Sequence, residues 1–495
     1  MRITNNMIMT NSKSNINSTK ELVDKYNTQM TTQKKISKAS EDPVVAIRSL
    51  RLSTNLSHID QYVENNIPDA QSWLDVTYTA LNNMKKLLTD VHTLCVNGST
   101  DTLTADDRNT ILKQLQSYSE QVYSEGDADY AGRTVFTGYR TSSDLTFMKD
   151  DPDTTYNIDQ TFTYEDMEEH RYYTAGVTVP SEVNTTTPEC TTDIKEYSYQ
   201  RIRMGYGDIN GDFTMNISDA AGNVINTYDQ STATVYDTEL DFQNALESGE
   251  IASSDVIFIR DAGEFVLGKG ISGDIASNEY NISVNYTKTG FEASDARPEY
   301  YFDCTNETEG LSFTVSDDAI KYTVANNTDI TVNTQAKDVL DTSIKRDVDE
   351  LIDVVSEAIA ANAKVDTINQ MLKESQYADE NSQTILNGYL SAAKQEADYA
   401  NDNLKKTYSQ YQTNFSNYLD KVNLAITNVG STQKRLDLIQ TRVENQQTTI
   451  EELKSDNEDR DLSEIIIDYY AIYNAYKSSL TAASKVGEQT LLNYI

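Results

Sequence analysis

The chain is poor in the residues that build metal and redox sites. Its 495 residues include three cysteines, Cys95, Cys190 and Cys304, which stand too far apart for the close pairs of zinc and redox motifs. Cys95 falls on a predicted helical seam, where a free thiol packs as a small hydrophobic side chain. A disulfide between Cys190 and Cys304 stays open as the less favoured alternative to free thiols.

Histidine is equally sparse, and His58, His92 and His170 are isolated from one another. The run 168–170, Glu-Glu-His, lacks the second histidine at helical spacing that a zinc protease needs. The run 208–212, Asp-Ile-Asn-Gly-Asp, alternates oxygen ligands as calcium loops do, but it lacks their bidentate glutamate, so a plain turn is favoured. We therefore expect no enzyme activity, with no catalytic residues, no metal and no cofactor.

Long apolar runs and an excess of basic charge are also missing. The chain has 41 basic and 78 acidic side chains, a net charge of -37, which leaves no basic surface for nucleic acid or an anionic membrane. No apolar run approaches the length of a membrane span, and residues 1–13 lack the apolar core of a signal peptide. We expect no nucleic acid or membrane partner, and export would need a route without a cleaved signal.

What the sequence has in abundance is helical periodicity. From Leu404 to Leu453, seam positions recur at alternating steps of four and three residues, which keeps them on one stripe of a helix. At ~1.5 Å per residue this helix would be roughly 75 Å long. The stripe consists of Leu404, Tyr408, Tyr411, Phe415, Tyr418, Val422, Ala425, Val429, Thr432, Leu436, Ile439, Val443, Gln446, Ile450 and Leu453. Such a seam needs an equally long partner.

The first part of the chain supplies that partner. The same spacing runs from Val63 to Cys95, with Pro68 predicting a kink or a restart of the helix. A shorter seam follows over 111–122. From Asp347 the helical pattern returns and continues into the long seam. The sequence therefore predicts an antiparallel coiled-coil rod built from both ends of the chain.

Between the two halves of the rod the periodicity changes. Residues 141–345 are rich in Thr, Tyr, Val and Ile in short runs separated by turns, which predicts one or two β-rich domains. The run Tyr130–Tyr139 is expected to be a strand bounded by glycines. Residues 141–345 hold 38 acidic and 12 basic side chains, so 12 - 38 = -26 of the net charge lies in this insert. The insert should therefore face solvent.

The fold class is accordingly α+β, with five segments. They are a terminal helical segment (1–45) that orders only on assembly, the first half of the rod ending in a β-hairpin (46–140), the acidic outer insert (141–345), the second half of the rod (346–455) and a terminal helix (456–495). The terminal helix should present an interface for other subunits or a chaperone, made of Leu462, Ile466, Tyr469, Tyr473, Tyr476, Leu480, Leu491 and Leu492. Taken alone, its tyrosines would sooner suggest packing within one subunit.

Four stretches resemble the bacterial flagellin superfamily, and within it the hook-filament junction proteins. They are the start Met1–Met7, the run Lys34–Ile36 followed by Ser40-Glu41-Asp42-Pro43, the run Arg133–Tyr139 with Phe136 and Gly138, and the end from Asp461 to Ile495. Together they cover roughly the first 140 and the last 150 residues. Gln33 stands where this family usually has glycine, which argues against a sharp turn there, and Glu41 replaces an aspartate.

The resemblance implies a non-enzymatic subunit of an extracellular flagellum that forms a junction ring between hook and filament. It further implies export through the flagellar type III pathway, a chaperone on the terminal helix, and contacts with a second hook-associated protein, with flagellin and with copies of itself. Two alternatives stay open, namely flagellin itself and a cell-surface adhesin acting through the insert.

Overall fold

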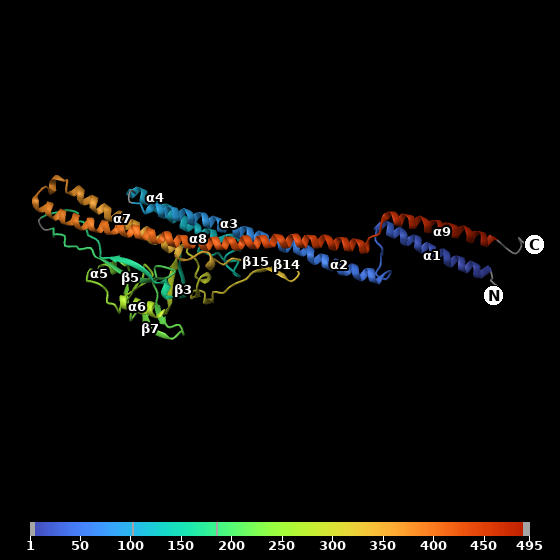
Figure 1. The fold of residues 1–495 in the computed structure, drawn as a ribbon, viewed down its shortest axis with the longest axis horizontal. Coiled ribbons are helices and arrows are strands. Elements are labelled where there is room, and N and C mark those ends of the chain that lie inside the picture. The colour runs from blue at the N-terminus through green and yellow to red at the C-terminus, as the bar shows by residue number, and fades with distance from the viewer. Residues whose placement is uncertain (1–4, 101–102, 185–186, 489–495) are drawn as a thin grey trace, which may run out of the picture. The chain divides into compact units, whose positions relative to one another are not determined.

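The computed structural model describes residues 5–100, 103–184 and 187–488, and the chain divides into two compact units. Unit 1 comprises Met1–Gln71, Tyr322–Ile330 and Lys434–Ile495, and unit 2 comprises Ser72–Lys321 and Thr331–Gln433. Two helices, α3 (Ile67–Gly98) and α8 (Glu380–Glu458), contribute residues to both units. The predicted combination of helical chain ends with a β-rich middle is confirmed (Figure 1).

Unit 1 is mainly helical. Helices α1 (Asn5–Thr32) and α9 (Leu462–Glu488) lie side by side, and α2 (Pro43–Gln61) accompanies the last part of α8 (Figure 1). Most of a hairpin, β14 (Lys321–Ala325) and β15 (Thr328–Thr331), also belongs to this unit.

A π-helical turn, Tyr62–Asn66, stands where the sequence predicts a kink or restart at Pro68. The Ile67 N–H donates to the carbonyl of Tyr62, one residue further back than in an α-helix. The wider turn lets the chain continue into α3 past a residue that has no N–H to donate. The interruption is therefore a local change of helical pitch.

Unit 2 contains the buried part of the long seam. Eight seam residues from Leu404 to Val429 are each at most 8% exposed. The Gln433 amide donates to Asp75 at 2.7 Å, and a Cβ added at Gly98 would lie 2.4 Å from the Tyr408 ring. Because the residue numbers rise on α3 while they fall on α8, the two helices run antiparallel in this unit. Helix α4 (Ala105–Ser124) packs against α7 (Ser343–Met371).

The unbroken helical pattern expected from Asp347 into the seam is wrong at residues 372–379. Helix α7 ends at Met371, a 3-10 turn spans Ser375–Tyr377, and α8 begins at Glu380. The Asp379 carboxylate accepts from the Ser382 N–H at 3.2 Å and caps the new helix. Tyr377 is buried although it lies in the turn, which explains why apolar spacing alone did not reveal the break.

The single strand expected over Tyr130–Tyr139 is also wrong. Strands β1 (Asp129–Tyr130) and β2 (Arg133–Thr134) have two residues each and pair as an antiparallel hairpin. The chain turns again after β2. Ala131 and Gly132 have φ values of 53° and 75°, the backbone that tight hairpin turns require.

Within unit 2 the insert forms two sheets that share one core, whereas most of its β14–β15 hairpin belongs to unit 1. The first sheet has the order β13-β12-β3-β11-β6-β7, and the second has the order β4-β5-β10-β9-β8. The rings of Phe213 on β6 and Phe258 on β9 lie 4.3 Å apart between the two sheets. All pairings in these sheets are antiparallel except β8 with β9.

The elements of the insert are bounded as follows. The first sheet comprises β3 (Asp151–Phe162), β6 (Phe213–Ser218), β7 (Val224–Asp229), β11 (Asn281–Phe291), β12 (Asp303–Asn306) and β13 (Leu311–Phe313). The second comprises β4 (Glu168–Tyr173), β5 (Glu196–Arg203), β8 (Thr234–Tyr236), β9 (Val256–Ile259) and β10 (Glu264–Leu267), with helices α5 (Glu239–Leu246) and α6 (Lys269–Asn278) beside the sheets.

The three cysteines, all within the described residues, are free thiols, so Cys190 and Cys304 do not pair in this structure. Burial raises the pKa of Cys95 to about 12, in keeping with its place on the helical seam. Among the helices that the structure describes, none carries an apolar stretch long enough to cross a bilayer.

Candidate assembly interface

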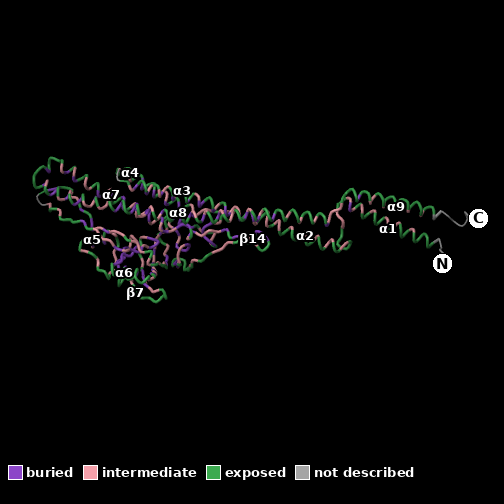
Figure 2. The backbone as a smooth tube through the Cα atoms, viewed as in Figure 1, coloured by how far each residue is buried: buried purple, intermediate pink, exposed green. Residues whose placement is uncertain are grey.

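The terminal helices α1 and α9 pair through one narrow seam. Apart from Asp468, the half-buried and buried positions of α9 recur at steps of four and three residues, and apart from Thr28 and Gln29 those of α1 do the same. On α9 they are Ile465, Tyr469, Ile472, Tyr476, Ser479 and Ala483, and on α1 they are Ser12, Ile16, Thr19, Val23, Tyr26 and Met30. Figure 2 shows both helices mostly in the colour of exposed residues.

This seam buries very little. Over residues 6–32 and 462–485, where burial is described, only Gln29 and Ile465 are buried. A fully buried apolar side chain contributes ~1.5–3 kcal/mol, whereas ordering a residue costs about 1–2 kcal/mol. The α1–α9 pair is therefore weakly stabilised within a single subunit.

The outer side of α9 carries large apolar side chains that are exposed to solvent. Ile467 is 67% exposed and Tyr470 is 60% exposed. Of the residues that the sequence singles out, Leu462, Ile466, Tyr473 and Leu480 are between 36% and 43% exposed. Singly exposed hydrophobic residues are ordinary, but a run along one helix is typical of a surface that is covered by a partner.

The predicted interface thus mixes two faces of α9. Tyr469 and Tyr476 lie on the seam with α1, whereas Leu462 and Ile466 lie outside it, and Leu491 and Leu492 fall outside the described residues. Ile465 and Ile467 were missed. Three consecutive isoleucines allow several stripes of the same spacing, so periodicity alone does not decide which one faces α1.

Two connectors meet at the end of this helix pair where α1 ends and α9 begins. Residues 33–42 join α1 to α2, and residues 459–461 join α8 to α9. Lys34 and Asp459 form an antiparallel bridge, and the Lys34 Nζ lies 2.6 Å from Asp459 Oδ1 and 3.0 Å from Glu458 Oε2. The hydrogen bonds that Lys34 donates, first to Asp459 and then to Glu458, raise the pKa of Lys34. The connectors are therefore held together by backbone pairing and by ion pairs open to solvent.

Gln33 makes the sharp turn that its side chain seemed to argue against. Its φ is 56°, in the left-handed region that glycine adopts without strain. Its N–H donates to the Gln29 carbonyl at 2.6 Å, and its own carbonyl accepts from the Arg460 N–H at 3.0 Å. The Arg460 guanidinium also donates to the Gln29 side chain at 3.1 Å and lies over the Tyr26 ring. The strained Gln33 is therefore held by one hydrogen bond to α1 and by another from Arg460 of the second connector.

The run Ser40-Glu41-Asp42-Pro43 starts α2. Asp42 is the N-cap and accepts from the N–H groups of Val44 and Val45 at 3.0 and 3.1 Å, and Pro43 takes the first helical position. Glu41 accepts from the Ser37 hydroxyl at 2.7 Å, which lowers the pKa of Glu41. The longer arm of Glu41 therefore reaches back to Ser37 within the connector, and Ser40 is exposed.

Phe136 and Gly138 have structural roles in unit 2. Phe136 is buried, and its carbonyl accepts from the Ala336 N–H at 2.9 Å. Gly138 has a φ of 62°, and a Cβ there would lie 2.4 Å from Asp318 Oδ2. The same Asp318 oxygen accepts from the Tyr139 N–H at 2.9 Å, so glycine keeps room for a carboxylate that fixes the next residue.

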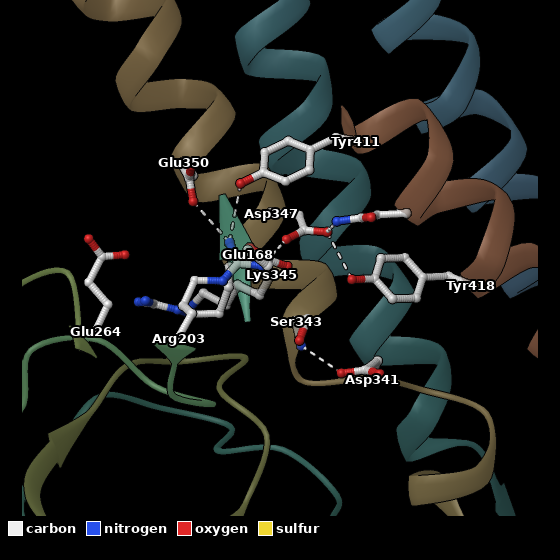
Figure 3. Close-up of polar contacts among 12 residues, drawn as sticks. Glu168, Arg203, Glu264, Asp341, Ser343, Lys345, Asp347, Glu350, Tyr411 and Tyr418 are labelled. Carbon is white, nitrogen blue, oxygen red and sulfur yellow. Dashed lines mark hydrogen bonds and ion pairs between the residues drawn. The ribbon is translucent and has the colours of Figure 1, made fainter. Parts of the chain in front are cut away.

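A buried charged cluster joins the insert to α7 and α8 inside unit 2 (Figure 3). Arg201 on β5 donates to Glu350 on α7 at 2.8 Å and to Glu264 at 3.0 Å. Arg203, two residues along the same strand, donates to Glu350 at 3.0 Å and pairs with Asp347. This cluster was not predicted from the sequence.

The electrostatics act differently on the two carboxylates of α7. Burial would raise the pKa of Glu350, but the charges of Arg201 and Arg203 outweigh it and hold that pKa well below its usual range, whereas at Asp347 burial outweighs Arg203 and raises the pKa. Burial lowers the pKa of His170 to about 3, and Arg201 adds to the effect. Asp347 is fully buried and also accepts from the Tyr418 hydroxyl at 2.8 Å. The cluster therefore holds the insert on the helices and leaves no open site for a ligand.

Among the residues that the structure describes, no group of three or more His, Cys, Asp or Glu side chains could hold a metal ion. The loop 208–212 is bonded to strand β11. The Gly211 N–H donates to the Thr287 carbonyl at 3.1 Å, and the Asn210 side chain accepts from the Thr289 N–H at 3.0 Å.

Comparisons with known proteins point to one family. Residues 3–141 match the model of the bacterial flagellin N-terminal helical region. Flagellar hook-associated protein 3 of Escherichia coli strain K12 is 28% identical over 126 residues, which cover 24% of this chain and 38% of that protein. The protein of the same name from Salmonella typhimurium strain LT2 is 26% identical over 144 residues, covering 29% of this chain and 45% of the relative. The matches thus span less than half of these relatives.

Solved structures of similar proteins superpose only loosely. A putative flagellar hook-associated protein from Vibrio parahaemolyticus gives a TM-score of 0.37 at 14% identity, covering 85% of this chain and 100% of that one. Flagellar hook-associated protein 3 from Legionella pneumophila gives 0.22 at 11% identity, covering 80% and 98%. The family match and the curated relatives confirm the resemblance predicted from the sequence, and over residues 3–141 this chain is similar to the bacterial flagellin N-terminal helical region.

Proposed function

We propose that this chain is a structural, non-enzymatic subunit of the bacterial flagellum that forms the junction ring between hook and filament. The observation that carries the proposal is the thin seam between α1 and α9 together with the uncovered apolar side of α9. Helices that bury so little alone gain stability when neighbouring subunits cover them, which couples their ordering to assembly. The flagellin-type amino-terminal region supports the same assignment.

In this proposal the outer side of α9 has two successive partners. A flagellar export chaperone covers Leu462, Ile466, Tyr473 and Leu480 before delivery, and neighbouring subunits cover them afterwards. Export follows the flagellar type III route without a cleaved signal. The mature neighbours are a second hook-associated protein, flagellin and other copies of this chain, and the strongly acidic insert opposes lateral bundling of the assembled tubes.

The test is the double variant Ile466→Asp with Tyr473→Asp. Both side chains are partly exposed, so the isolated subunit should keep its helix content while chaperone binding and motility are lost. The matched control is Asn474→Asp with Ser478→Asp, which adds the same charge at exposed polar positions of the same helix. Normal chaperone binding and normal motility in the Ile466 and Tyr473 variant would overturn the proposal.

A further inference from the structure

Unit 1 contains a large apolar groove away from the α1–α9 pair. Its walls are α2 and the part of α8 after residue 434, and the β14–β15 hairpin closes one side. The groove has a volume of about 1100 Å³. Leu438 and Leu453 lie in it with 74% and 51% of their surfaces exposed, and Ile59, Tyr62 and Ile450 line it half-buried.

The walls are held at a fixed spacing. The Gln447 amide on α8 donates to Asp60 on α2 at 2.8 Å. The Asn66 amide donates to the Thr323 carbonyl at 2.7 Å and ties the hairpin to the π-helical turn. Residues of all three walls therefore belong to one connected structure, and the groove is present before any partner binds.

Burial of the long seam stops where the groove opens. Leu436, Ile439 and Val443 are each at most 7% exposed, whereas Gln446 and Leu453 on the same stripe are exposed. No residue of α2 is buried. In this stretch only the short β14–β15 hairpin packs beside the two helices, and a helix laid along the groove would cover the side that the hairpin leaves open.

The charge of the groove is unlike that of the chain. Although the sequence has 78 acidic residues, none of the fifteen residues that line the groove is Asp or Glu. Arg442 lines the groove. Arg435 precedes it by seven residues, so it lies on the same face of α8, beside Leu438. Of the acidic residues in this part of α8, those at 437, 444 and 451 recur every seven residues, and the others, at 452, 456 and 458, lie towards its end; none of the six lines the groove.

Helix α2 repeats the pattern. Arg48 and Arg51 share a stripe with Asn55, His58 and Tyr62, which line the groove from α2 and the π-helical turn together with Ile59. Within the part of the chain that the structure describes, the guanidinium groups of the four arginines at 48, 51, 435 and 442 have no hydrogen-bond or ion-pair partner. All four arginines are exposed. Unpaired arginines around an apolar surface are typical of protein interfaces.

We propose that this groove docks an acidic amphipathic helical surface of a second copy of this chain. The partner must bring carboxylates to the four arginines, and a second copy of this chain, with 78 acidic against 41 basic side chains, supplies carboxylates in excess. Two grooves cannot face each other, because their arginines would repel. The contact is therefore head-to-tail, the type that closes into a ring or continues as a helix. The inference rests on the proposed function in naming one of its subunit contacts.

The test is sedimentation velocity of the full chain over a concentration series at low and high salt. The charge-reversal variant Arg435→Glu with Arg442→Glu and the variant Leu438→Asp alter exposed side chains of the groove, so folding should persist. The control is Lys85→Glu with Lys86→Glu, which makes the same charge change at exposed positions of α3. The wild-type chain and the control should associate, with weaker binding at high salt, and both groove variants should raise the dissociation constant at least about tenfold.

Equal association of the wild-type chain and the groove variants would overturn the inference while leaving the proposed function standing. A wild-type chain that stays monomeric at all concentrations would overturn it as well. A photo-crosslinker at position 438 in cells gives a second readout. Capture of another copy supports the inference, and capture of a different flagellar protein in its place overturns it. The Ile466 and Tyr473 variant, which tests the proposed function, should leave this association unchanged.

Discussion

Arg201 on strand β5 donates to Glu350 on helix α7 at 2.8 Å, and this contact joins the insert to the helices. Both side chains are largely buried, at 3% and 18% exposure. The Arg201 guanidinium also reaches Glu264 on β10, so a single side chain connects two strands and a helix. Because hydrogen bonds and ion pairs are directional, a cluster of several of them constrains the position of the insert on the helices.

Replacing Glu350 by Gln should strongly destabilise the chain. The change leaves Arg201 and Arg203 in a buried site without their shared carboxylate, and breaking a buried pair in this way costs about 3–5 kcal/mol. Urea unfolding of the full chain measures the loss. Asp366→Asn, an exposed position on the same helix, is the control and should stay within about 0.5 kcal/mol of the wild type. A Glu350→Gln midpoint equal to that of the control would contradict the role assigned to the cluster.

The stability of the chain should fall between pH 6.5 and about 3, in part through His170. Burial lowers the pKa of His170 from 6.5 to about 3, so in this range the unfolded chain binds a proton that the folded chain does not. The contribution is full above the unfolded pKa and is lost as the pH falls towards the folded one. The variant His170→Gln should therefore show a shallower decline in the free energy of unfolding across this range. A decline as steep as that of the wild type would exclude His170 as a source.

Two glycines in the family motif region should respond differently to alanine. In Gly132→Ala the added Cβ lies within 4 Å of no atom, so the only cost is the strain of a φ of 75°, about 1 kcal/mol of unfolding free energy. Gly138→Ala has a φ of 62° and also pushes against the Asp318 carboxylate, which should add about 1–3 kcal/mol. Thermal unfolding of the two variants measures the difference. Equal losses would show that Asp318 moves aside freely.

Gln33→Gly should stabilise the connector between α1 and α2. Glycine relieves the left-handed strain at a φ of 56°, and the gain exceeds its extra entropy cost in the unfolded chain by a few tenths of a kcal/mol to about 1 kcal/mol. Hydrogen exchange of the last turns of α1 reports the effect. Slower exchange is expected in Gln33→Gly and unchanged exchange in the control Gln33→Ala, which keeps the strain. Faster exchange in the glycine variant would contradict this account of the turn.

The helical seam was predictable because its spacing leaves a single solution. From Leu404 to Val429 only one stripe is apolar, and it is the stripe that the structure buries. On α9 the run Ile465–Ile467 supports more than one stripe, so the interface was predicted one position away from the seam with α1. Which stripe of α9 becomes the seam depends on where α1 packs, and the sequence of α9 alone does not determine that.

The sequence shows the two pairs of charged residues in the cluster, but it does not show that the pairs contact each other. Arg201 and Arg203 alternate and so share one face of a strand, while Asp347 and Glu350 are three apart and share one face of a helix. Each pair alone resembles an ordinary solvated face. Only the packing of β5 against α7 brings the two pairs together, and that is a tertiary contact between residues about 150 positions apart.

The most direct test of the proposed function is electron microscopy of the purified full-length chain in polymerising salt, with and without hook ends and short filament seeds. A junction subunit should not grow filaments alone, should cap hooks, and should then accept flagellin. Long filaments grown by this chain alone would contradict the junction role and identify a filament subunit. Failure both to grow and to cap hooks would contradict the flagellar role altogether and leave the adhesin alternative.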